Sequence, residues 1–159
     1  MTTREKAINT ACKIVDNHCA YIYGAQGEKL KALTPEDIKR METSAQNVIY
    51  VAEYIDMLRA HGWLSNKSKA FDCSGLICYI LVKCGVESAG FDLTADGLAE
   101  RYPKTAALKP GVLLHRKGHI ALYIGQRYLI EAKGRRCGVV VSWYDPDEWD
   151  RSFPDPFTD

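Results

Sequence analysis

The chain has 159 residues, of which 47% are hydrophobic and 26% are charged, and its net charge is +1. This composition is typical of a folded protein, and the length suits one domain, residues 1–159, with a sizeable core. The small net charge gives no electrostatic reason to expect binding to nucleic acid or to an anionic membrane. No apolar run approaches the roughly 18 residues of a membrane span, and the charged N-terminal region lacks the apolar core of a secretory signal.

Helical patterns dominate the N-terminal two thirds of the chain. Apolar residues at helical spacing predict helices over residues 3–20, from Thr34 to Ala60 with a break near residues 43–44, over residues 73–83, and over residues 94–101. Residues 21–27 are expected to form a glycine-bounded aromatic loop after the first helix.

The C-terminal third changes to a strand pattern. Residues 112–115, 120–124, 128–132 and 138–143 predict a small antiparallel sheet with glycine-containing turns. Residues 143–157 are aromatic, acidic and proline-containing, and we expect them to pack on the surface as a tail. Helices followed by strands indicate an α+β fold, with the N-terminal helices packed on the sheet.

The segment Phe-Asp-Cys-Ser-Gly-Leu-Ile, residues 71–77, carries the strongest functional signal. It places Cys73 where a polar loop gives way to a helical apolar pattern. The start of a helix favours negative charge, so we expect the pKa of the Cys73 thiol to be lowered and the thiolate to act as a nucleophile. A buried structural cysteine is the alternative, but the flanking small residues favour catalysis because another molecule can approach closely.

A nucleophilic cysteine needs a base, and His119 is the best placed of the four histidines. It opens the strand that ends in a turn at Gly125, and the next strand carries Glu131. In such a hairpin the start of one strand lies opposite the end of the other, so His119 and Glu131 are expected to be neighbours. Together with Cys73 they would form a Cys–His–acid triad.

The other cysteines are expected to be reduced core thiols. There are six cysteines in all, but the helical patterns are unlike those of a small disulfide-bonded scaffold. His115 and His119 are four residues apart, a spacing that would suit metal binding if they lay on a helix. This segment instead has a strand and loop pattern, so a zinc site is not expected. The sequence therefore predicts neither a metal nor a cofactor.

The motifs resemble those of the NlpC-type cell-wall cysteine peptidases, which are papain-like enzymes that cut peptide stems of bacterial peptidoglycan. The matching strings are Phe-Asp-Cys-Ser-Gly-Leu-Ile (71–77), Leu-Lys-Pro-Gly (108–111), Gly-His-Ile-Ala-Leu-Tyr-Ile-Gly (118–125), Ile-Glu-Ala (130–132) and Tyr-Ile-Tyr-Gly-Ala (21–25). The resemblance covers residues 5–27 and approximately 70–143. The string at residues 130–141 is especially similar to phage- and prophage-borne members from gut Firmicutes, including tail-associated hydrolases.

The resemblance implies a role for six residues. Cys73 would be the nucleophile, His119 the base and Glu131 the third polar residue. Tyr21 and Asp72 match positions that hold the free amine of the stem peptide, and Ser74 lines the same pocket. The implied reaction is hydrolysis of the amide between γ-D-glutamate and the following diamino acid, through an acyl-enzyme.

Three departures from the family pattern stand out. Ala25 replaces the second glycine of the tyrosine motif and is expected to narrow the approach to that loop. Val112 stands where aspartate is usual, so one loop contact is expected to be missing. Residues 28–69 form a helical insertion before the nucleophile, which would roof the substrate groove, dock a phage-tail or wall-associated partner, or brace the core.

Two other classes of function remain open from the sequence. One is a Cys–His amidase or acyltransferase that acts on a different amide, and the other is an idle wall-binding or virion structural module. A lone-cysteine redox sensor is a weaker idea, since no resolving cysteine adjoins Cys73. The expected place of action is the bacterial cell wall, reached as part of a virion, from the cytoplasm at lysis, or by an export route without a secretory signal.

Overall fold

The structure, a computed structural model, describes all residues 1–159. Its helices are α1 (Thr3–Asp16), α2 (Pro35–Met41), α3 (Ala45–Ala60), α4 (Cys73–Lys83) and α5 (Ala95–Arg101), with short 3-10 turns η1 (Leu30–Ala32) and η2 (Pro146–Glu148). Its strands are β1 (Ala20–Tyr21), β2 (Gln26–Lys29), β3 (Lys69–Phe71), β4 (Lys104–Thr105), β5 (Leu113–Arg116), β6 (His119–Gly125), β7 (Tyr128–Gly134), β8 (Gly138–Trp143) and β9 (Phe153–Pro154). None of the helices has both the length and the apolar character needed to cross a bilayer.

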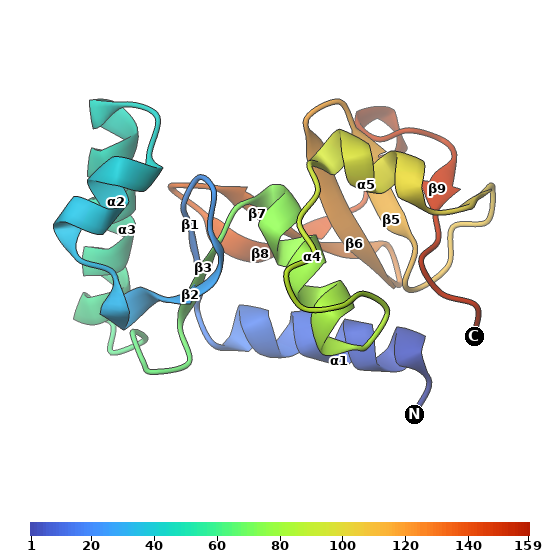
Figure 1. Ribbon diagram of the computed structural model, residues 1–159, viewed down its shortest axis with the longest axis horizontal. Coiled ribbons are helices and arrows are strands. Elements are labelled where there is room, and N and C mark those ends of the chain that lie inside the picture. The colour runs from blue at the N-terminus through green and yellow to red at the C-terminus, as the bar shows by residue number, and fades with distance from the viewer.

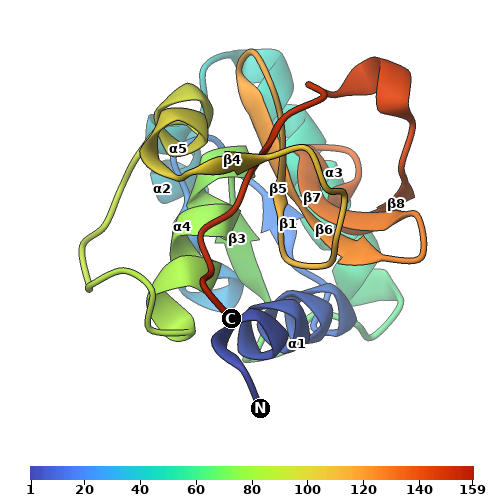
Figure 2. The same ribbon diagram turned by 90° about the vertical axis from the view of Figure 1, so that its right-hand side faces the viewer.

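The predicted C-terminal sheet is confirmed. Strands β5, β6, β7 and β8 form one antiparallel sheet in chain order. Alternate side chains such as Leu122 and Ile130 point to one face, where they join the apolar residues of α1 and α4 in the largest core cluster. Figure 1 shows α1 and α4 against this face, and Figure 2 shows the same packing from the side. The α+β architecture follows from this helix-on-sheet layer.

The expected surface tail is instead part of the core. The opposite face of the sheet carries Leu114, Tyr123 and Leu129, and these residues are covered by the buried aromatic side chains of the C-terminal segment. Strand β9 in that segment pairs with β4. The prediction was wrong because the aromatic residues of this segment are needed to cover the second face of the sheet.

A second sheet, which the sequence did not indicate, precedes the nucleophile helix. Strand β3 lies between β1, which runs parallel to it, and β2, which runs antiparallel. The expected aromatic loop, residues 21–27, therefore begins at the end of β1 and ends within β2. The first helix also ends at Asp16, earlier than expected, because His18 adopts a left-handed backbone conformation with φ of 57°.

The segment of residues 28–69 folds around an apolar cluster of its own. Helices α2 and α3 contribute Ile38, Val51 and Leu58 to this cluster, and β1 and its following loop contribute Ile22 and Ala25. The two helices stand at one end of the molecule, with the four-stranded sheet toward the other end (Figure 1). The segment therefore packs directly on the strand and loop that hold Tyr21.

Gly75, in the first turn of α4, lets this loop approach the nucleophile helix. A Cβ at position 75 would lie 2.1 Å from the carbonyl oxygen of Ala25, a contact that no real Cβ makes. The same carbonyl accepts a hydrogen bond from the Asp72 N–H at 2.9 Å. Only glycine allows the loop and the helix to pack at this distance.

Gly75→Ala is therefore expected to destabilise the protein. The added methyl would push backbone against backbone, and we expect the free energy of unfolding to fall by about 1–3 kcal/mol. Chemical denaturation monitored by circular dichroism measures this, with Gly134→Ala as the control because a Cβ there meets nothing within 4 Å. Equal stability of Gly75→Ala and wild type would contradict the packing argument.

Candidate active site

Cys73 is the first residue of α4, as the sequence predicted. Asp72 caps the helix, and its carboxylate accepts hydrogen bonds from the Gly75 N–H at 2.7 Å and from the Ser74 hydroxyl at 3.3 Å. Its second oxygen accepts the Gly24 N–H at 2.9 Å. The cap leaves the first backbone N–H groups of the helix available to the sulfur of Cys73.

The pKa of the Cys73 thiol is raised, which corrects the prediction that it would be lowered. Burial is the main cause, and the adjacent Asp72 carboxylate adds to it. The N–H groups of Ser74, Ile120 and Cys73 itself act in the opposite direction but do not outweigh these effects. Cys73 is therefore a thiol at neutral pH, and any role as a nucleophile would need a base to remove its proton.

The structure brings Cys73 to the start of β6. The sulfur lies 3.7 Å from the carbonyl oxygen of Gly118 and also contacts the N–H of Ile120, so the residues on either side of His119 both touch it. This contact joins the nucleophile helix to the strand that carries the candidate base.

His119 and Glu131 are hydrogen-bonded neighbours, as the hairpin pattern predicted. Nε2 of His119 lies 2.7 Å from Oε1 of Glu131, and both side chains are largely buried. The register of β6 and β7 explains the contact, because Tyr123 pairs with Leu129 and the two site residues then lie on the same face of the sheet. Since a carboxylate only accepts, Nε2 carries a proton and Nδ1 is left free in the neutral ring.

The pKa of the Glu131 carboxyl lies below its ordinary value. Burial acts to raise it, but hydrogen bonds from His119 and Ser142 favour the charged form and outweigh the burial. The carboxylate is therefore charged at neutral pH, and it holds the imidazole of His119 in one tautomer and one orientation.

Sequence reasoning missed the residue that supports the His119 ring. Trp149 stacks on it, with ring centroids 5.6 Å apart and planes inclined by 29°. Trp149 is itself buried, and the Arg116 guanidinium lies over its ring at 4.5 Å. The aromatic content of the C-terminal segment was the only signal, and it did not indicate which side chain would reach the site.

An open cleft of about 380 Å³ lies beside Cys73. Four of the six predicted site residues line it, namely Tyr21, Asp72, Cys73 and Ser74, whereas His119 and Glu131 do not. The remaining lining residues are Tyr23, Gly24, Gln26, Asp92, Leu93, Thr94, Ala95, Asp96 and Gly118. Three of the lining residues are aspartates, and none is lysine or arginine.

A second histidine, His115, fixes the turn that carries Gly118. Its Nε2 lies 2.8 Å from Asp96 and its Nδ1 lies 2.7 Å from Asp150, while Asp96 also accepts the Gly118 N–H at 2.9 Å. Asp96 and Gly118 both line the cleft, so these contacts support its wall next to Cys73.

Two further expectations need correction. Ala25 does not narrow the approach to its loop, because its methyl group is fully buried in the cluster formed with residues 28–69. Cys137 is exposed, so it is not a core thiol. Val112, the other departure, is buried in the cluster on the far face of the sheet.

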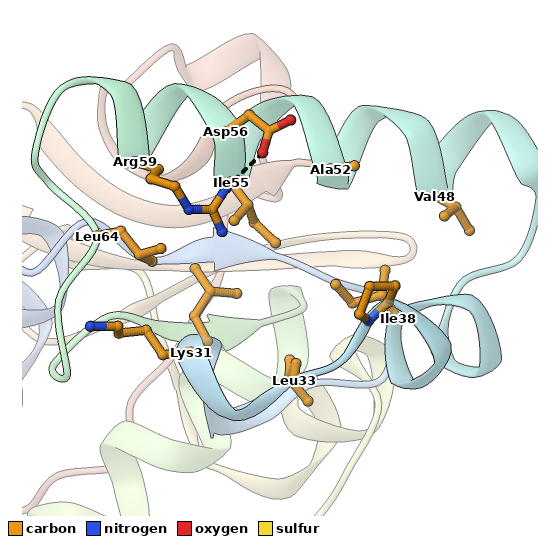
Figure 3. A pocket seen from close by; sticks show the side chains of 11 residues that line it. Lys31, Leu33, Ile38, Val48, Ala52, Ile55, Asp56, Arg59 and Leu64 are labelled. Atoms are coloured by element: carbon orange, nitrogen blue, oxygen red, sulfur yellow. Dashed lines mark hydrogen bonds and ion pairs between the residues drawn. The ribbon is translucent and has the colours of Figure 1, made fainter.

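A separate apolar hollow of about 330 Å³ lies within the helical segment (Figure 3). Leu33, Ile38 and Ile55 line it, and the exposed ion pair between Asp56 and Arg59 spans its rim. It shares no residue with the cleft at Cys73 and contains no nucleophile. None of the six predicted site residues lines this hollow.

The chain belongs to the NlpC/P60 family. The family model matches residues 59–155, which include Cys73, His119 and Glu131 and begin near the end of α3. The resemblance inferred from the motifs is thus confirmed. Comparison with curated protein sequences gives no match.

Solved structures share the fold at low sequence identity. The peptidoglycan hydrolase RipB of Mycobacterium tuberculosis is similar with a TM-score of 0.62 and 17% identity, over 98% of this chain and 67% of that one. The P60 domain of the antigen MAP1204 from M. avium subspecies paratuberculosis is similar with a TM-score of 0.53 and 20% identity, over 96% of each chain. NlpC1 of Trichomonas vaginalis is similar with a TM-score of 0.62 and 15% identity, over 99% of this chain and 45% of that one.

The link between His119 and Glu131 predicts a pH-dependent stability difference. Because the folded-state pKa of Glu131 is lowered, its charge stabilises the fold above its unfolded-state pKa, and this contribution is lost as the pH falls through the folded-state pKa. At pH 7, Glu131→Gln is expected to lower the free energy of unfolding by about 1–3 kcal/mol.

Urea denaturation from pH 7 down to pH 3 measures this difference. The stability difference between Glu131→Gln and wild type should become smaller at pH values below 4.5, the ordinary pKa of the carboxyl group. The matched control is Glu148→Gln, an exposed carboxylate. A difference between Glu131→Gln and wild type that stays constant with pH would contradict the assignment of a charged, hydrogen-bonded Glu131.

Proposed function

We propose that the protein is a cysteine peptidase that hydrolyses an amide bond in peptidoglycan stem peptides, between γ-D-glutamate and the following diamino acid. The observation that carries the proposal is the meeting of Cys73, at a helix start beside an open cleft, with the strand that holds the bonded pair His119 and Glu131. Membership of the NlpC/P60 family and the fold shared with a peptidoglycan hydrolase support it.

In the first step His119 activates the nucleophile. Nδ1, the ring nitrogen that is not bonded to Glu131, takes the proton from the Cys73 thiol, and Glu131 stabilises the imidazolium that forms. The raised pKa of the thiol makes this base necessary. The thiolate then attacks the amide carbonyl carbon to give a tetrahedral oxyanion.

Backbone donors at the start of α4 would hold this oxyanion. The N–H groups of Cys73 and Ser74 lie at the sulfur and, as residues of the first helical turn, lack intrahelical partners. One such donor contributes about 3 kcal/mol to the stability of the transition state. His119 next gives its proton to the leaving amine, the C–N bond breaks, and a thioester remains on Cys73.

Water completes the cycle. His119 removes a proton from water, the hydroxide attacks the thioester, and the released Cys73 thiolate recovers that proton. The products are a carboxylic acid on the glutamate side and a free amine on the diamino acid. No metal or cofactor takes part in any of these steps.

The charge of the cleft suits a substrate that carries a free amine. Asp72 lies beside Cys73 with Tyr21 and Ser74, and Asp92 and Asp96 line the same cleft. With three carboxylates and no basic side chain in the lining, the cleft attracts an ammonium group and repels an anionic one. Tyr21, Asp72 and Ser74 are accordingly proposed to bind the amino end of the stem peptide.

Cys73→Ala is expected to abolish cleavage and leave the fold intact. The sulfur is the attacking atom, and its replacement by hydrogen removes the nucleophile from position 73. Mass spectrometry of defined muropeptides after incubation measures cleavage, and the new termini identify the bond. Residual turnover at the wild-type rate would rule out the mechanism.

Glu131→Gln is expected to retain partial activity, reduced by about 100-fold, because an amide oxygen still accepts from His119 but cannot stabilise the imidazolium. The same muropeptide assay measures the rate. Unchanged activity of Glu131→Gln would remove Glu131 from the triad. A wild-type protein that binds muropeptides without cleaving any of them would instead indicate a wall-binding module.

A further inference from the structure

Glu42, at the end of α2, is a buried charge with unusually complete pairing. Its side chain is 0% exposed, and a carboxylate withdrawn from water in this way is stable only when it is paired and hydrogen-bonded. Arg135 donates to it from Nη2 at 2.9 Å and from Nε at 3.2 Å. The backbone N–H groups of Tyr23 and Thr43 also donate to it, at 3.1 and 3.2 Å.

Arg135 continues the connection to the cleft. It lies between β7 and β8, and its guanidinium carbon is 5.0 Å from the centre of the Tyr21 ring. An arginine held in this position gains from the attraction between its charge and the ring face. The ion pair with Glu42 orients the planar guanidinium so that it lies against Tyr21.

The residues reached by this bridge belong to the wall of the cleft. Tyr21 and Tyr23 both line the cleft that contains Cys73. Glu42 bonds the backbone of Tyr23 directly and contacts the ring of Tyr21 through Arg135. One carboxylate of the helical segment thus holds both tyrosines, in addition to the apolar cluster through which Val51 and Leu58 pack on the same loop.

We propose that Glu42 and Arg135 are positioning residues for substrate binding, and that the segment of residues 28–69 sets substrate affinity by fixing the tyrosine wall of the cleft. The inference rests on the proposed function, because it needs a stem peptide to occupy this cleft. It assigns the helical segment a role in recognition. Neither residue touches Cys73 or His119, so the chemical step itself should be little affected.

The test compares KM with kcat in variants of the bridge. Glu42→Gln and Arg135→Gln are each expected to raise KM about tenfold for an L-Ala-γ-D-Glu-diamino acid tripeptide, with kcat within about threefold of wild type. The rate of Cys73 alkylation by iodoacetamide, which needs no substrate, should not change. Asp56→Asn is the matched control, since it removes a carboxylate of the same segment from an exposed ion pair.

The double variant Glu42→Gln with Arg135→Gln tests whether the two residues act as one unit. Its KM should be no higher than that of the worse single variant, because both substitutions break the same bridge. Arg135→Lys protects the fold by keeping a cation beside the buried carboxylate, but it lacks the planar group over Tyr21. Its KM is also expected to rise.

Several results would overturn the inference. The first is a KM equal to that of wild type in Glu42→Gln or in folded Arg135→Lys. The second is a KM in the double variant that rises by the product of the two single effects. The third is a fall in kcat of the single variants, with slower alkylation of Cys73 and an unchanged KM. Failure of the proposed function is a separate outcome, because it would appear as cleavage by Cys73→Ala or as no cleavage by wild type. The control variant should match wild type in every measurement.

Discussion

The packing of one loop against the start of one helix determines the whole site. Asp72 caps α4 and also accepts the Gly24 N–H, while its own N–H donates to the Ala25 carbonyl. These bonds tie the nucleophile helix to the loop that carries the cleft tyrosines. They form only because Gly75 has no side chain to separate the two backbones. The position of Cys73 relative to its cleft therefore depends on a contact between main-chain atoms.

The second half of the site is built on the sheet. The antiparallel register sets His119 and Glu131 on one face, and the C-terminal segment covers that face with Trp149. Hydrogen bonding then keeps Glu131 charged against the effect of burial and holds His119 in one orientation, while burial keeps Cys73 protonated. Burial raises the pKa of both groups, and the hydrogen bonds from His119 and Ser142 reverse the shift only at Glu131.

The sequence was most informative where structure is local. The apolar spacing after Cys73 predicted the nucleophile helix, and the alternation around Gly125 predicted the hairpin that joins His119 to Glu131. Both depend on residues close together in the chain. The four-stranded sheet and the α+β class follow from the same short-range patterns.

The features that were missed depend on contacts between distant segments. Strands β1 and β3 are too short to leave a pattern, and their pairing joins segments that are about 50 residues apart in the chain. Nothing near Glu42 in the sequence indicates its partner Arg135, and Trp149 reaches His119 from the far end of the chain. The sign of the Cys73 pKa shift was also missed, because burial and the effect of Asp72 can be assessed only in the folded structure.

The central claim is that Cys73 attacks the substrate and carries its acyl group. The most direct measurement is acid quenching of the protein during turnover of a stem peptide, followed by mass spectrometry of its proteolytic fragments. The account predicts a thioester adduct of the L-Ala-γ-D-Glu portion on the fragment that contains Cys73. An adduct on another residue, or continued hydrolysis by protein whose Cys73 is fully alkylated, would contradict it.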